Sequence, residues 1–504
     1  NSGMSTGVQQ GATGVGGNLS IETGQLTITG GGQIVAGTLG EGKGGTLQVK
    51  ATDSIDLIGT NSKAQSSGLF TQTQGSGNAG NLSIETMRLR VREGAQVSAA
   101  TLGEGQAGTL DVKAFDSIEL SGTSLINSRI VSSLLTQAEG AGSAGDLTIS
   151  TRQLIVQNGA RVSAATNGIG NAGNIRIETE KLIVQGIGQV IAGTFSEGRG
   201  GNLQVIATDS IELIGISADG KSSSAIATQA QGSGNAGNLT VKTGQLIVRD
   251  GAIASVSSLD KGAAGNLQVE TRSIQLDNGT LKATTTAGDR GNITIQSQNL
   301  QMRHNSNITT NASNTANGGN ITIDTGVLAA LEDSDIRANA VRGQGGNITI
   351  DTQGIFASSN SEIDAASELG INGVVTLNTP DTDPSRGLIA LPEIPVDPTR
   401  LIAQGCPANK TSRFSITGRG GLPPNPSEAL GTDGVVVNWV TLESKGENIS
   451  TSAISTSPTR SIPTPSIEAQ GFQRYANGDV ILTATPPTVT PYSSLSTPVF
   501  CHGR

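Results

Sequence analysis

The chain has 504 residues, of which 2% are aromatic, 14% are charged and 70 are glycine, and its formal net charge is −9. Aromatic side chains supply much of the buried area of ordinary globular cores, so this composition excludes several such domains in series. Two histidines and two cysteines are too few for a His/Cys metal centre, and the acidic balance argues against nucleic-acid binding. We expect no cofactor and no transmembrane helix, because no apolar run reaches roughly 18 residues.

A five-residue tag, Gly-[Asn/Thr/Asp]-[Leu/Ile]-x-[Ile/Val], recurs at intervals of 26 to 37 residues through residues 1–378. Each period carries three short alternating stretches, such as Leu19/Ile21, Leu26/Ile28 and Ile34/Ala36 in the first copy. Alternation of this kind predicts strands with one buried face. Strands this short fold only when successive copies stack and bury a common apolar column. The sequence therefore predicts an all-β fold, a parallel β-helix of about 13 coils over residues 1–378.

Asparagine follows the tag glycine in most copies, and stacked amides at equivalent corners can hydrogen-bond along a solenoid. We interpret this row as a structural ladder, with a ligand or ion track as the alternative. The ladder residues are Asn18, Asn81, Asn174, Asn202, Asn238, Asn266, Asn292, Asn320 and Asn347, and Thr46, Thr109 and Asp146 fill the other three positions.

All 16 prolines, the single tryptophan and both cysteines lie after residue 378. Proline cannot donate to a β-ladder, so the β-helix is expected to stop near Asn378. We predict a Pro-rich linker at 379–404 and a β-rich region at 405–504, with strand-like pieces near Ile416, Trp439 and Ile481 and a Ser/Thr/Pro-rich loop at 444–466.

The repeat, together with the phrases G-R-G-G-L-P-P-N-P at 418–426 and T-P-Y-S-S at 490–494, resembles the large filamentous haemagglutinin-like exoproteins of cyanobacteria. The resemblance covers nearly the whole chain. It implies a right-handed, triangular β-helix, exported by two-partner secretion, with a role at the cell surface or in adhesion. The amino-terminal secretion domain of that family is missing from this sequence, so the resemblance implies an outer-membrane two-partner transporter only for a longer precursor.

In an exported protein, Cys406 and Cys501 are most simply a disulfide, which would close a loop of roughly 95 residues. The alternative is a redox or metal role with His502 beside Cys501.

The last coil of an open β-helix exposes unpaired backbone groups. We therefore also expect part of 379–504 to cover that coil, with Trp439 as an anchor.

Enzymes with parallel β-helices use clustered carboxylates, and the nearest match here is Asp333/Asp335 with His304 one coil earlier. The preferred interpretation is that Asp335 is a solvated turn residue. The segments beginning at Asp53, Asp116 and Asp209 raise the alternative of a calcium site, but their coils are not adjacent, so a charged outer edge that keeps the solenoid soluble is preferred.

Insertions in a solenoid project from one face, often the binding face. The longer coils place Leu69, Phe70, Leu134 and Leu135 in such segments, either as partly exposed recognition residues or as a bulged third side. Together these features predict a secreted or cell-surface, adhesin-like rod that is not an enzyme and contacts a surface polysaccharide or another cell. The alternative is a carbohydrate-active β-helix enzyme, a polysaccharide lyase or hydrolase.

Overall fold

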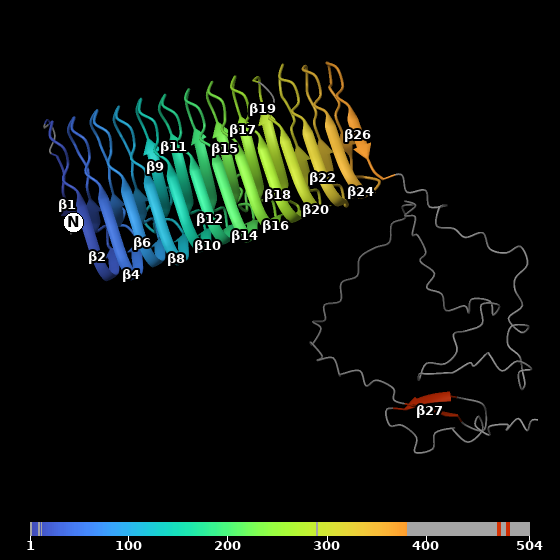
Figure 1. The fold of residues 1–504 in the computed structure, drawn as a ribbon, viewed down its shortest axis with the longest axis horizontal. Helices are drawn as coiled ribbons and strands as arrows, with labels where there is room; N and C mark the ends of the chain where they lie inside the picture. Colours follow the sequence, from blue (N-terminus) through green and yellow to red (C-terminus); the bar gives the residue numbers. More distant parts are fainter. Residues whose placement is uncertain are drawn as a thin grey trace, which may run out of the picture. The chain divides into compact units, whose positions relative to one another are not determined.

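A computed structural model describes residues 3–8, 11, 13–288, 291–380, 471–474 and 480–483. The chain divides into two compact units, Asn1–Asp383 and Pro384–Arg504. Every regular element in the described residues is a β-strand. The expected parallel β-helix is confirmed: the first unit is a β-solenoid of about 13 turns, built from two 13-stranded parallel sheets (Figure 1).

One sheet contains the longer strand of each coil, and we call it the long-strand sheet. Its members, in spatial and sequence order, are β2 (Leu19–Thr29), β4 (Leu47–Ile58), β6 (Leu82–Arg92), β8 (Leu110–Ser121), β10 (Leu147–Gln157), β12 (Ile175–Gln185), β14 (Leu203–Ile214), β16 (Leu239–Arg249), β18 (Leu267–Asp277), β20 (Ile293–Arg303), β22 (Ile321–Ala330), β24 (Ile348–Ala357) and β26 (Val375–Asn378).

The short-strand sheet contains the other strand of each coil. Its members are β1 (Gly3–Ser5), β3 (Gln33–Val35), β5 (Gly68–Phe70), β7 (Gln96–Ser98), β9 (Ser133–Ala138), β11 (Arg161–Thr166), β13 (Gln189–Thr194), β15 (Ala225–Ala230), β17 (Ile253–Ser258), β19 (Thr280–Thr285), β21 (Asn307–Thr309), β23 (Asp335–Arg337) and β25 (Ile363–Asp364).

The structure has two strands in each coil where the sequence suggested three, because the first two alternating stretches form one continuous strand. In β6 the alternation of buried and exposed residues breaks at Met87 and Arg88, which both point outward, and then resumes. Strands β4, β8 and β14 are one residue longer than their neighbours and absorb the difference as a bulge at this position. The strand therefore turns a corner at this position, where its pairing with the neighbouring coils skips a residue and then resumes.

A single column of aliphatic side chains fills the interior. In the coil that contains β6 and β7, Ile84, Leu89 and Val97 are almost fully buried, and equivalent residues of the neighbouring coils stack on them in register. Leu, Ile, Val and Ala make up nearly all of this core, which explains the low aromatic content. Burial of this column is the main force that holds the coils together.

Between each short strand and the next long strand, the chain leaves the core and returns, and we call the stack of these excursions the flange. The outgoing segments pair in parallel, as in the bridges from Thr73 to Thr101 and from Thr101 to Ala138. The returning segments also bond coil to coil, since the Ala107 N–H donates to the Ser143 carbonyl. Figure 1 shows the flange as a row of loops along one side of the stack.

The last strand of the solenoid, β26, ends at Asn378. In the second unit the structure describes β27 (Gly471–Arg474) and β28 (Val480–Thr483), which pair antiparallel, and β28 includes Ile481. The linker expected at 379–404 and the region expected at 405–504, including Trp439 and the loop 444–466, otherwise lie outside the described residues. Within the described part of the chain, no helix has the length and hydrophobicity needed to cross a membrane.

Candidate functional site

The tag asparagines lie in one row at the entrance of the long strands. In this row the side-chain oxygen of one coil accepts the backbone N–H of the equivalent residue on the next. Asn174 accepts from Asn202 at 3.0 Å, Asn202 from Asn238 at 2.9 Å, and Asn238 from Asn266 at 2.9 Å. Asp146 fills the same position and accepts from Asn174 at 2.8 Å. The row therefore links coils through side chain to backbone bonds more than through the amide to amide contacts considered above.

A second row of acceptors, three residues before the tag asparagine, was not recognised from the sequence. Asn78 accepts the N–H of Gln106 at 2.9 Å, Asn171 that of Arg199 at 2.9 Å, and Asn235 that of Ala263 at 2.9 Å. The signal was present in the repeated phrase N-A-G-N, which contains both acceptors, for example at 171–174. The side chains of these two rows join neighbouring coils where the returning segment of the flange leads into the long strand.

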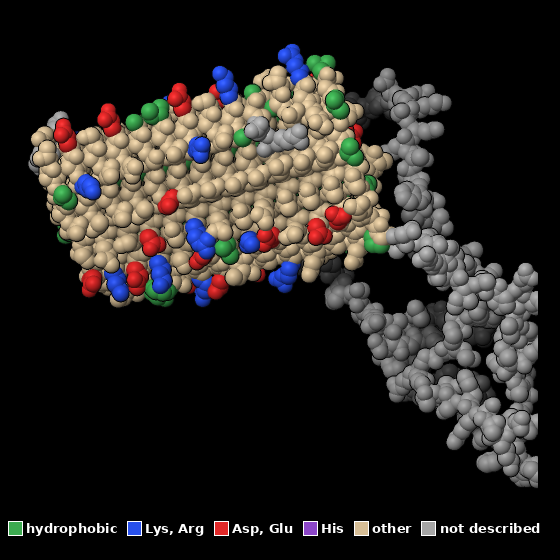
Figure 2. All heavy atoms as spheres, turned by 45° about the horizontal axis from the view of Figure 1, so that its top comes forward, with side chains coloured by type: hydrophobic (Ala, Val, Ile, Leu, Met, Phe, Trp, Pro, Cys, Tyr) green, Lys and Arg blue, Asp and Glu red, His purple; other side chains and the backbone are tan. Residues whose placement is uncertain are grey.

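The outer face of the long-strand sheet carries ion pairs between neighbouring coils. Asp53 pairs with Arg88 at 2.9 Å and Asp116 pairs with Arg152 at 3.2 Å. Arg90 donates two hydrogen bonds to the Asp56 carboxylate, and this hydrogen bonding is the largest cause that raises the pKa of Arg90. Figure 2 shows charged side chains of both signs along one margin of the stack.

Asp209, the third residue considered for calcium, lines a shallow hollow with Arg152, Glu180 and Lys181. This arrangement places two cationic side chains beside the carboxylates. Among the described residues, no group of three or more His, Cys, Asp or Glu side chains is arranged to hold a metal ion.

The enzyme-like residues are placed differently from expectation. Asp335 was expected to be a solvated turn residue, and that is wrong: it is only 4% exposed, at the start of β23. Its carboxylate accepts the backbone N–H of Glu362 at 2.8 Å and pairs with Arg337 at 2.9 Å. Asp333 is exposed in the preceding turn, with a positive φ of 64°. The two aspartates therefore have different environments, because Asp335 is buried and paired with Arg337 while Asp333 is exposed in the turn.

His304 contacts neither Asp333 nor Asp335 in the interactions that the structure shows. Its Nδ1 lies 2.6 Å from Asp277 and its Nε2 lies 3.0 Å from Glu332, carboxylates of the coils on either side. Glu332 also accepts a hydrogen bond from Arg303, which holds the pKa of Glu332 below its ordinary value. This group is an exposed charge network that spans three coils at one corner.

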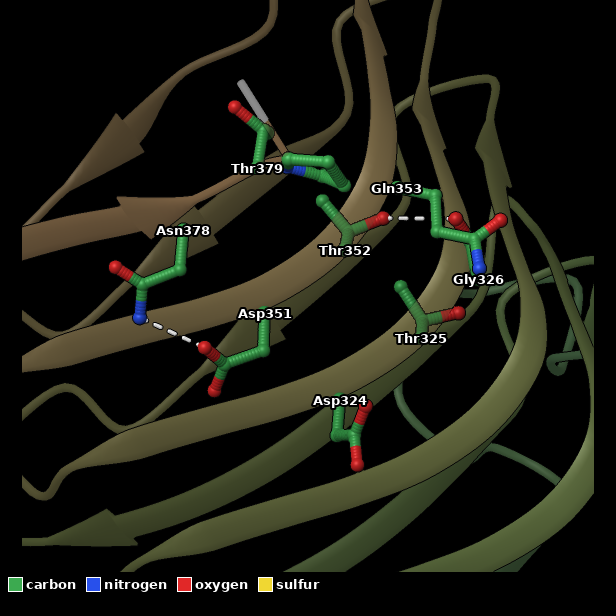
Figure 3. Close-up of a pocket in the computed structure, with 9 residues that line it drawn as sticks. Asp324, Thr325, Gly326, Asp351, Thr352, Gln353, Asn378 and Thr379 are labelled. Carbon is green, nitrogen blue, oxygen red and sulfur yellow. Dashed lines mark hydrogen bonds between the residues drawn. The ribbon is translucent and has the colours of Figure 1, made fainter. Parts of the chain in front are cut away.

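A second carboxylate pair lies in an open hollow at the end of the solenoid (Figure 3). Asp324 and Asp351 are directly paired residues of β22 and β24, and Asp351 accepts a hydrogen bond from the Asn378 amide at 2.7 Å. Thr352 Oγ1 donates to the Gly326 carbonyl at 3.1 Å. The hollow encloses about 460 Å³ and opens to solvent. Strand spacing places these carboxylates close enough to bind one polar group. No motif in the sequence marks the two residues, because they lie one coil apart.

The prediction that Leu69, Phe70, Leu134 and Leu135 are exposed recognition residues is wrong, because these side chains are buried or half-buried. Leu69 and Phe70 lie in β5 and Leu134 in β9, and these three side chains are at most 4% exposed, while Leu135 is half-buried. They are not exposed loop residues, because their segments form the third side of the coil, as the alternative interpretation held. The insertions that follow β4, β8 and β14 are instead 59–67, 122–132 and 215–224.

The first two insertions contact each other, since the hydroxyls of Thr60 and Ser124 lie 2.7 Å apart. The second one exposes Leu125 and Ile126.

The two cysteines predicted to form a disulfide, Cys406 and Cys501, lie outside the described residues. Comparisons of the chain with protein-family models, with curated proteins and with solved structures find no match. The function must therefore be inferred from the geometry.

Proposed function

We propose that the protein is a secreted or surface-associated, adhesin-like rod that acts by extension and by contacts of its surface rather than by catalysis. The observation that carries this proposal is the use of the polar corner residues, because the asparagine rows at Asn174 and Asn171 join one coil to the next. At a strand spacing of about 4.8 Å, the solenoid unit is about 60 Å long. A molecule built in this way displays a long surface at a distance from its attachment point.

The hollows of the described surface support contacts that are shallow and repeated. The hollow at Asp324 and the one at Arg152 are both open, and each is formed by equivalent positions of successive coils. Weak contacts repeated along one rigid body gain affinity through multivalency. A surface polysaccharide or another cell presents such repeated ligands, and we propose these as partners.

Export through an outer-membrane two-partner transporter, as part of a longer precursor, belongs to the same proposal. Its support is the resemblance in the repeat and the C-terminal phrases. Fractionation of source cells with an antibody raised against the full chain tests it. We expect the chain in the medium, or on intact cells where added protease removes it. A chain found only inside cells would contradict the proposal.

A binding experiment separates the adhesin from the enzyme alternative. The full chain is applied to glycan arrays and intact cells, and in parallel to acidic polysaccharides whose cleavage is followed by reducing ends and unsaturated products. We expect saturable binding without cleavage, and no binding by heat-denatured chain. Cleavage that is lost in Asp351→Asn or Asp333→Ala, but kept in Asp53→Asn, would overturn the proposal in favour of an enzyme.

A further inference from the structure

The three longest insertions form a row of hairpins at one corner of the solenoid. Each of 59–67, 122–132 and 215–224 follows a long strand and closes with an antiparallel bridge. The bridges join Thr60 to Ser66, Thr123 to Val131 and Ile216 to Ser223. The second hairpin stands two coils from the first, and the third stands three coils further on. At about 4.8 Å per coil, the row is about 24 Å long. We call these three insertions the corner hairpins.

A buried serine fixes the base of each corner hairpin. The Ser132 hydroxyl donates to the Ser121 carbonyl at 2.8 Å and accepts the N–H of Gly94, on the preceding coil, at 2.9 Å. Ser67 and Ser224 make the equivalent pair of bonds in the other two hairpins. The corner hairpins are therefore fixed to the stack where they leave it.

The second hairpin carries two aliphatic side chains in solvent at its tip. Leu125 is 87% exposed, the highest value of any large hydrophobic residue that the structure describes, and Ile126 is 57% exposed. The Ser124 hydroxyl accepts the N–H groups of Ile126 and Asn127 at 3.2 and 3.3 Å. Because the turn hydrogen-bonds these backbone groups internally, the tip can enter a nonpolar phase without leaving them unpaired.

The corner hairpins carry cations in a chain that is acidic overall. Lys63, Arg129 and Lys221 are exposed, one in each hairpin, and take part in none of the ion pairs shown among the described residues. Asp219 is the only carboxylate within the three insertions. Glu93, also exposed, belongs to the short turn between the first two hairpins rather than to either of them. The hairpin row is therefore positive, whereas the whole chain has a net charge of −9.

We propose that the corner hairpins bind an anionic lipid surface. Leu125 and Ile126 enter the boundary between headgroups and acyl chains, and the three cations contact headgroup phosphates. Apolar side chains together with cations are what holds proteins to such surfaces. Two aliphatic side chains are too small a patch for a stable protein interface, which buries about 800 Å² on each partner. A fluid bilayer needs no complementary shape, so a narrow projecting tip can enter it.

A polysaccharide fits the corner hairpins less well. Leu125 and Ile126 cannot hydrogen-bond to its hydroxyl groups, and a hydrated polymer offers them no apolar phase. The inference goes beyond the proposed adhesin, because it assigns a lipid partner to a surface distinct from the hollows at Asp324 and Arg152.

Flotation of the full 504-residue chain with vesicles tests the inference. The vesicles contain either phosphatidylcholine alone or equal parts of phosphatidylcholine and phosphatidylglycerol. We expect binding to the anionic vesicles only, weakened as the salt concentration rises. Leu125→Ser combined with Ile126→Ser should lower the partition coefficient about tenfold, since the apolar contact is lost. Arg129→Gln should lower it about fivefold and reduce its dependence on salt.

Ile169→Ser is the matched control, because Ile169 is 61% exposed but lies in the flange. It should bind as the wild type does, and circular dichroism and thermal unfolding check that every variant keeps its fold. A wild-type chain that does not float with anionic vesicles would overturn the inference. So would binding that survives the Leu125→Ser, Ile126→Ser variant, or that Ile169→Ser lowers equally.

Light scattering without vesicles separates the lipid from a second copy of the chain. We expect no self-association that depends on the hairpin tip. Self-association that the Leu125→Ser, Ile126→Ser variant abolishes, with vesicle binding unchanged, would replace the lipid by a second copy. None of these outcomes decides the proposed adhesin, which is tested separately on glycans and intact cells.

Discussion

The side-chain oxygen of Asn320 accepts the backbone N–H of Asn347 at 3.0 Å, while the N–H of Asn320 donates to Asn292 at 2.9 Å. Asn320 is thus both acceptor and donor in a row that joins three successive coils. Asn320→Ala removes the acceptor for Asn347 and should cost about 1 kcal/mol, the usual value of one such hydrogen bond. Urea unfolding followed by circular dichroism measures the change.

Asn320→Asp is the control, because Asp146 occupies the same position and accepts in the same way. It should retain most of the stability that Asn320→Ala loses. Equal destabilisation by both substitutions would show that the amide group, rather than its acceptor oxygen, stabilises the row.

The glycine of the tag is predicted to be essential where backbones stack. A Cβ added at Gly173 would lie 1.9 Å from the carbonyl oxygen of Gly145, and neither backbone can move without breaking the ladder. Gly173→Ala should destabilise the solenoid by about 3 kcal/mol or more, as overpacking does in rigid surroundings. Thermal unfolding of the purified variant measures it, together with its soluble yield.

Gly24→Ala provides the comparison, since a Cβ at Gly24 would meet no atom within 4 Å. This substitution should be neutral or slightly stabilising, because alanine lowers the entropy of the unfolded chain. If the Gly173→Ala variant were as stable as the Gly24→Ala variant, the close contact between Gly173 and the carbonyl oxygen of Gly145 would be refuted.

The coil period was predictable from the sequence because the tag repeats the same corner chemistry in every coil. The end of β26 at Asn378 also coincides with the loss of glycine and the first proline. The continuous long strand was not predictable, since the break in alternation at Met87 and Arg88 looks like a turn in the sequence. Only the pairing between neighbouring coils shows that the strand continues on both sides of this break.

The candidate sites were harder to predict because insertions shift the alignment of coils. Phe70 and Leu134 follow insertions, and their place in the longer coils suggested exposure, but the insertion ends before the strand that contains them. The neighbours of Asp53 and His304 depend on which coil lies above and below. Partners such as Arg88 and Glu332, separated in sequence by about one coil, could be identified only from three-dimensional register.

The stability of the solenoid should depend on pH through Glu332. Its pKa is lowered from the ordinary 4.5, mainly by the hydrogen bond from Arg303. A carboxyl whose pKa is lower in the folded state stabilises that state above its unfolded pKa, and this contribution disappears as the pH falls through the folded value. The wild type should therefore unfold at a higher temperature than Glu332→Gln at pH 7, and the difference should vanish well below pH 4.5.

Glu41→Gln controls for general charge effects, because Glu41 is exposed on the flange and forms none of the ion pairs shown among the described residues. Its unfolding temperature should follow that of the wild type at both pH values. If the difference between wild type and Glu332→Gln stayed constant as the pH fell from 7 to well below 4.5, the ionised form of Glu332 would not be its cause.

The pair formed by Asp56 and Arg90 should be the most strongly coupled of the ion pairs on the long-strand sheet. It has two hydrogen bonds, of 2.5 and 2.9 Å, and the Asp56 side chain is only 16% exposed. A double-mutant cycle with Asp56→Ala and Arg90→Ala should give a coupling of about 1 kcal/mol, and high salt should reduce it only in part. Lys50 and Glu85, on the same two strands, are 3.5 Å apart and about half exposed, so their coupling should be close to zero. Equal coupling in the two pairs would contradict the assignment of the difference to burial and bidentate geometry.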